Sequence, residues 1–291
     1  MVNSMSIKEI SNNPTLAGQV RLIEDIVYSA ADGEAQKMSI LAPWTQRYKD
    51  LPQTKRPLLV FVQGSSWTTP TLGEKIPQLV QFVHAGYIVA TVQHRSALDG
   101  HAFPAFLQDV KTAIRYLRAH AAEYQIDPDR VGIWGTSSGA NAALLTALTP
   151  NDPRYETADY ADQSDAVDAV ISCFAPTDVA DTFAFSKNVP GSDAMQFCLF
   201  GTDPTKWPAI KREMSPLYQV KDNQQYPPFL LMHGDADKTV PYHEMEDMYH
   251  ELEKHHVAVE AYRVRGAVHE RDFWSQQIYD IAREFLDRNV K

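Results

Sequence analysis

The chain has 291 residues, of which 44% are hydrophobic and 22% are charged, as is ordinary for a soluble globular protein. Asp and Glu total 37 against 27 Lys and Arg, and the net charge of −10 argues against a surface for nucleic acid or an anionic membrane. Two cysteines, Cys173 and Cys198, are too few for a disulfide framework or a zinc ribbon, and we interpret each as a buried free thiol.

Short apolar runs alternate with amphipathic stretches along the chain. Residues 20–29 and 37–43 lack a long helix between them and predict an antiparallel hairpin at a sheet edge. Later runs are continuous and rich in branched residues, as strands covered on both faces are. They are LLVFV (58–62), YIVATV (87–92), VGIW (131–134), AVISCFA (169–175) and FLLM (229–232), with VAVEAYRV (257–264) as a further strand.

Helical patterns lie between these strands, notably over residues 103–124 and 241–254. Strands that alternate with helices predict an α/β fold with a mostly parallel central sheet flanked by helices. We expect a single domain over residues 1–291. Residues 177–226 are polar, turn-rich and aromatic, and we interpret them as a small lid-like insertion.

The stretch WGTSSGAN (134–141) lies between a predicted strand and an apolar helical run. The pattern G-x-S-x-G requires Gly135, Ser137 and Gly139, so Ser137 is the candidate nucleophile, lifted above the carboxyl edge of the sheet by a tight turn. Ser138 begins the helix, and its backbone N–H points toward the same space as a candidate oxyanion donor. Without context the pattern fits a helix N-cap equally well, but the strand before it and the helix after it favour the nucleophile.

An acid and a base follow in the order that a serine nucleophile of this kind requires. The loop after residues 229–232 carries Asp235 and Asp237; we choose Asp237 as the acid and expect Asp235 to shape the turn. His269, in the loop before the final helix, is the candidate base. We interpret His233 as a packed histidine that steadies the acid loop. The alternative for both aspartates is that they are turn residues only.

The segment HELEKHH (250–256) is similar to the zinc motif H-E-x-x-H, but position 254 is Lys254 and His255 lies five residues after His250. Two ligands on one helical face need a separation of four, so we predict no metal. The N-terminal residues lack the features of a secretory signal and no apolar run is long enough for a membrane span, so we expect a cytoplasmic protein without a membrane partner.

Four stretches follow one another in a recognisable order, within a region that extends from about residue 20 to the end of the chain. They are QGSSWTTP (63–70), residues 103–141, PPFLLMHGDADKTVPY (227–242) and GAVHERDFW (266–274). In these stretches the chain resembles the serine α/β-hydrolase esterases, and within them the bacterial feruloyl/acetyl esterase branch. The resemblance implies the α/β-hydrolase fold, ester hydrolysis through an acyl-enzyme on a small-molecule ester, and no cofactor. It also implies a second oxyanion donor, the backbone N–H of Ser65, with Ser66 as an additional candidate.

The oxyanion loop departs from the family pattern, because relatives commonly carry His-Gly-Gly-Gly-Trp where this chain reads Gln63-Gly64-Ser65-Ser66-Trp67. Serine makes any backbone with positive φ costlier than glycine does. The resemblance also favours a hydroxycinnamate ester as substrate, with short acetyl esters next. Aromatic side chains are candidates for the wall of an aryl pocket, although most aromatics simply pack in a core; the candidates are Trp67, Phe103, Phe106, Phe183, Phe200 and Trp207.

Other functions remain open at this point. An arylformamidase would use the same three residues on an amide, whereas a dienelactone hydrolase would need cysteine at position 137. From another class, the chain would fit a non-catalytic binding module on a hydrolase fold, since fold alone does not give function. All three candidate catalytic residues are present, which favours an enzyme.

Overall fold

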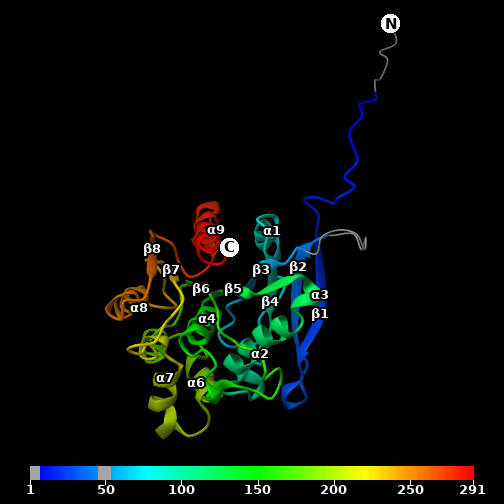
Figure 1. Ribbon diagram of the computed structural model, residues 1–291. Helices are drawn as coiled ribbons and strands as arrows, with labels where there is room; N and C mark the ends of the chain where they lie inside the picture. The colour runs from blue at the N-terminus through cyan, green and yellow to red at the C-terminus, as the bar shows by residue number, and fades with distance from the viewer. Residues whose placement is uncertain (1–6, 45–53) are drawn as a thin grey trace.

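The computed structural model describes residues 7–44 and 54–291, and its centre is an eight-stranded sheet with the order β1-β2-β4-β3-β5-β6-β7-β8 (Figure 1). The strands β3 to β8 are mutually parallel, while β1 and β2 form an antiparallel pair that joins the sheet through β4. This is the α/β-hydrolase fold. The strands are β1 (Val20–Ser29), β2 (Gln36–Pro43), β3 (Arg56–Val62), β4 (Ile88–Val92), β5 (Ile126–Thr136), β6 (Ala169–Cys173), β7 (Phe229–Gly234) and β8 (Val259–Val264).

Helices cover both faces of this sheet, because the central strands are apolar on both sides (Figure 1). One core lies between the sheet and two helices, α1 (Ile76–His84) and α9 (Gln276–Asn289). The other core lies on the opposite face, under α2 (Ala105–Ala119), α4 (Ser138–Leu148) and α8 (His243–Lys254). The short helix α3 (Ala121–Tyr124) follows α2 and leads into β5.

Helix α4 is the most enclosed of these elements. Every residue from Ser138 to Leu148 is buried, including the polar Asn141 and Thr146, so the helix is enclosed on all sides and firmly placed against β5 and β6. A residue at its N-terminus is therefore held at a fixed point above the carboxyl edge of the sheet.

The segment 177–226, expected to be an irregular insertion, is largely helical. It contains α5 (Val179–Phe185), α6 (Ser192–Phe200) and α7 (Trp207–Met214), which lie beside the core under α2, α4 and α8. Helix α7 packs against both α5 and α6, and Figure 1 shows α6 and α7 on the same side of the sheet as α4. Several apolar side chains of this segment pack into that core, which explains why helices form in a stretch with few long apolar runs.

The predicted strands and the hairpin agree with these elements, but β5 begins at Ile126, five residues before the run that predicted it. Of the two thiols, Cys173 is buried and Cys198 is only partly buried, so the expectation of two buried cysteines is wrong for Cys198. Within residues 7–44 and 54–291, none of the helices combines the length and apolar character that crossing a bilayer requires.

Candidate active site

Ser137 occupies a sharp turn between β5 and α4. Its backbone has φ 51° and ψ −125°, a conformation that side-chain-bearing residues rarely adopt. The turn is possible because its neighbours carry no side chain: a Cβ on Gly135 would lie 2.2 Å from the Gly139 carbonyl oxygen, and a Cβ on Gly139 would lie 2.1 Å from that of Val62. The two glycines of the G-x-S-x-G pattern are thus required by contact between backbones.

The structure brings the three candidate catalytic residues into one chain of hydrogen bonds. The Nε2 atom of His269 lies 2.9 Å from the Ser137 hydroxyl, and its Nδ1 atom lies 2.7 Å from Oδ2 of Asp237. The residues come from the loops after β5, β7 and β8, which are parallel strands whose carboxyl ends meet at one edge of the sheet. A serine so placed can lose its proton to the imidazole while the carboxylate stabilises the resulting cation.

Asp237 is built to remain ionised. Burial alone would raise its pKa, but hydrogen bonds from His233 and His269 and from the Thr239 N–H outweigh burial and lower the pKa below the usual range of an aspartate. Its Oδ1 accepts the N–H groups of Thr239 and Val240 at 2.7 and 3.0 Å. His233 lies 3.1 Å from Oδ2, as expected for a histidine that steadies this loop.

Asp235 forms hydrogen bonds that connect two loops. Its Oδ1 accepts the Gly266 N–H at 2.6 Å and its Oδ2 accepts Nε of Arg263 at 2.7 Å. It therefore ties the acid loop to the loop that carries His269, and it makes no contact with the imidazole.

The oxyanion loop corrects one expectation. The N–H of Ser65 donates to the side-chain oxygen of Ser138 at 2.9 Å, so it is not free to bind an oxyanion in this structure. The next residues, Ser66 and Trp67, have φ of 53° and 58°, and Ser66 lies on the wall of the cavity at Ser137. Within the described part of the chain, the Ser66 and Ser138 N–H groups have no hydrogen-bond partner. Both N–H groups are therefore available to an acceptor bound in the cavity at Ser137.

The loop of His269 is held by residues that the sequence did not single out. Phe174, which follows β6 with φ 43°, packs its ring edge-on against the imidazole with 4.8 Å between centroids. Glu270 accepts Nζ of Lys75 at 3.0 Å and Nε1 of Trp274 at 2.5 Å. Glu270 directly follows His269 in the sequence, which is a signal that its side chain lies near the site.

A cavity of about 410 Å³ opens at Ser137. Among the described residues, none of those lining it is charged, and apart from Trp67 the polar side chains in its lining are all serines and threonines. A site of this kind suits a neutral, largely apolar group. The apolar walls come from Trp67, Leu98, Phe183, Val189, Met195 and Val240.

The aromatic residues proposed for this wall divide into two groups. Trp67 and Phe183 line the cavity and stack with 6.0 Å between ring centroids, and Trp67 is also 5% exposed, so it is both a core residue and a wall residue. The other four do not line this cavity, because their side chains pack against other aromatic residues or into the core; they are Phe103, Phe106, Phe200 and Trp207.

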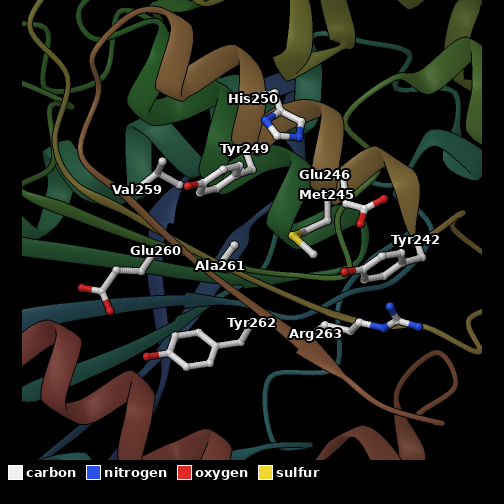
Figure 2. A pocket seen from close by; sticks show the side chains of 10 residues that line it. All are labelled: Tyr242, Met245, Glu246, Tyr249, His250, Val259, Glu260, Ala261, Tyr262 and Arg263. Atoms are coloured by element: carbon white, nitrogen blue, oxygen red, sulfur yellow. The ribbon is translucent and has the colours of Figure 1, made fainter.

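A larger hollow lies elsewhere, between α8 and the edge strand β8 (Figure 2). It measures about 590 Å³ and is lined by Tyr242, Glu246, Tyr262, Arg263 and their neighbours. It shares no lining residue with the cavity at Ser137 and contains none of the three hydrogen-bonded residues. The larger of the two cavities is therefore not the one at the hydrogen-bonded serine.

The sheet order and the strained serine between β5 and α4 define an α/β-hydrolase. Within that class, the chain belongs to the BD-FAE family, whose profile matches residues 48–252.

Two solved structures extend the comparison over nearly the whole chain. A truncated carbohydrate esterase from gut microbiota has 26% sequence identity and a TM-score of 0.76, covering 96% of this chain and 99% of its own. A propionate-bound esterase from Thermogutta terrifontis has 22% identity and a TM-score of 0.73, covering 95% and 96%, and shows the shared fold.

Among curated proteins, the chain is similar to Esterase LipC of Mycobacterium tuberculosis, with 30% identity over 197 residues. That match covers 67% of this chain and 48% of LipC. The chain thus spans about half the length of the curated relatives it matches.

Proposed function

We propose that this chain is a serine carboxylic ester hydrolase that acts through an acyl-enzyme. The observation that carries the proposal is the hydrogen-bonded chain from Asp237 through His269 to Ser137, at the mouth of an uncharged cavity. Family membership and the esterases among its relatives support the same reaction class.

The reaction begins when His269 Nε2 takes the proton of the Ser137 hydroxyl as Oγ attacks the ester carbonyl. The carbonyl oxygen becomes an oxyanion, which binds the N–H groups of Ser66 and Ser138; losing one such donor costs about 10²–10³ in turnover in serine hydrolases. The intermediate then expels the alcohol, which takes the proton from His269.

Water completes the cycle by the same steps. His269 takes a proton from the water molecule as its oxygen attacks the acyl-enzyme, and the Ser137 oxygen leaves with that proton when the acid is released. Asp237 remains ionised throughout and holds the imidazole with Nδ1 protonated, which leaves Nε2 free to accept. No cofactor takes part in this scheme.

For the substrate, we propose hydroxycinnamate esters of the feruloyl type, with short acetyl esters as the alternative. The support is the aromatic pair Trp67 and Phe183 in the wall, the apolar lining and the cavity volume of about 410 Å³, which offers more room than an acetyl group fills.

The test compares methyl ferulate with p-nitrophenyl acetate for the wild type and Ser137→Ala. We expect the wild type to hydrolyse both and the variant to hydrolyse neither. Acetate turnover without ferulate turnover would keep the mechanism and move the substrate to small acyl groups. Turnover that survives in Ser137→Ala would refute the assignment of the nucleophile, and failure of a fluorophosphonate to label folded wild type at Ser137 would favour a binding module.

A further inference from the structure

A buried carboxylate outside the hydrogen-bonded triad lies in the first turn of α8. The side chain of Glu244 is 1% exposed, although glutamate is almost never fully buried without partners. Its Oε2 accepts the backbone N–H groups of Thr177 and Asp178 at 2.6 and 2.9 Å, and its Oε1 accepts the Thr182 hydroxyl at 2.5 Å. Thr177 also donates its hydroxyl to the Glu244 carbonyl oxygen at 2.7 Å.

These contacts join the two sides of the cavity at Ser137. Helix α5 supplies one wall through Thr182 and Phe183, and the loop before α8 supplies another through Thr239 and Val240. Glu244 spans them: it belongs to α8, and every donor to its carboxylate belongs to α5 or to the two residues that precede that helix. The depth and width of the cavity at Phe183 therefore depend on where this carboxylate holds α5.

We propose that Glu244 is a positioning residue that determines acyl specificity: by fixing α5 against α8 it shapes the wall that a large acyl group touches and a small one does not reach. This inference rests on the proposed ester hydrolysis. Glu244 does not touch the reacting atoms, so its effect is on the wall and not on the chemistry at Ser137.

The protonation of Glu244 gives this role a measurable signature. Burial raises its pKa to about 8, opposed by the hydrogen bonds from Thr182, Asp178 and Thr177, while the charge of Asp181 adds to the rise. The ionisable groups around it are Asp178, which accepts the Tyr218 hydroxyl, and Asp181, which lies 2.9 Å from Nε2 of His243 on α8 itself. Since the raised pKa shows that burial opposes ionisation, the docked arrangement of α5 is favoured while the carboxyl group is neutral, and α5 is held less firmly above this pH.

The experiment compares p-nitrophenyl cinnamate with p-nitrophenyl acetate, two esters with the same leaving group and no ionisable group on the acyl chain. The matched variants are Glu244→Gln, which keeps the shape and removes the charge, and Glu246→Gln, which changes an exposed glutamate on the same helix. At pH 7, where the wild-type carboxyl group is neutral, we expect Glu244→Gln to keep the wild-type kcat/KM for both esters. A third variant, Glu244→Ala, removes the acceptor and should lower kcat/KM for the cinnamate about tenfold, mostly through KM, with a much smaller effect on the acetate. Glu246→Gln should match the wild type.

The pH dependence provides the second readout and needs no variant. The ratio of the two kcat/KM values cancels the titration of the groups that act on both esters. We expect this ratio to fall in the wild type as pH increases through about 8, where ionisation of Glu244 loosens α5, and to stay flat in Glu244→Gln. A flat ratio in the wild type, or equal losses on both esters in Glu244→Ala, would overturn the inference while leaving the proposed function intact. A wild type that hydrolyses neither ester would overturn the proposed function and this inference with it.

Discussion

Replacing Asp237 by asparagine tests the electrostatic arrangement of the site with almost no change in shape. All four groups that face the carboxylate are donors: two backbone N–H groups at Oδ1, and the rings of His233 and His269 at Oδ2. An amide has one oxygen and one NH₂, so one side must lose its acceptor. The backbone donors have no alternative proton position, and turning NH₂ toward them would cost two hydrogen bonds of about 1 kcal/mol each.

The amide oxygen therefore stays with the backbone, and NH₂ faces His269. The ring must then accept at Nδ1 and carry its proton on Nε2, which lies 2.9 Å from the Ser137 hydroxyl. A ring with this tautomer cannot take the serine proton. In serine enzymes of this design the wrong tautomer lowers turnover by about 10⁴, equivalent to about 5 kcal/mol of barrier.

The assay is p-nitrophenyl acetate hydrolysis at neutral pH for the wild type, Asp237→Asn and Asp235→Asn, with thermal unfolding to show that each variant folds. Asp235→Asn is the matched control, because Asp235 lies in the same loop and binds Arg263 and Gly266 but not the imidazole. We expect it to retain most of the activity. Equal losses in the two variants, or an Asp237→Asn variant close to the wild type, would refute the reasoning.

Three further predictions concern packing and burial. Gly139→Ala should lower both the melting temperature and kcat, since its Cβ would meet the Val62 carbonyl at 2.1 Å; Gly73→Ala, where a Cβ meets nothing within 4 Å, is the control, and equal melting temperatures would contradict the prediction. Phe183→Ala should lower the free energy of unfolding, measured with urea, by about 3 kcal/mol, because a buried ring that stacks on Trp67 is lost. The same variant should accept a wider range of acyl groups. Glu244→Gln should gain stability relative to the wild type, by up to about 5 kcal/mol, as pH rises from about 4.5 to 8. The sign of this stability change follows from the raised pKa of Glu244, because the folded wild type binds a proton in this pH interval that the unfolded chain has released. If the difference in unfolding free energy between the variant and the wild type did not vary with pH, the prediction would be contradicted.

The frame of the protein was predictable because its signals are local. Apolar runs separated by helical patterns gave the strands of the parallel sheet, and the glycines around Ser137 marked the turn. Asp237 was chosen over Asp235 because it lies two residues further into the loop. Of these two aspartates, Asp237 is the one that forms a hydrogen bond with His269.

The details of the site depend on contacts between distant segments. The Ser65 N–H in the oxyanion loop donates a hydrogen bond to the hydroxyl of Ser138, 73 residues later in the chain. This contact decides which N–H group of the loop stays free. Likewise, Phe183 faces the cavity and Phe200 does not, because of how α5 and α6 pack, which composition does not encode. Glu244 looked like one of several acidic residues of α8, and only its burial by α5 distinguishes it.

The bond between Ser137 and His269 joins positions 132 residues apart. Contacts of such long sequence separation form late in folding, because the intervening chain must first be ordered. During synthesis Ser137 leaves the ribosome before His269, so a partly made chain lacks the imidazole that is hydrogen-bonded to this hydroxyl in the complete fold. In a refolding experiment, turnover should accordingly return after the burial of Trp134, and it would report the completion of the whole fold.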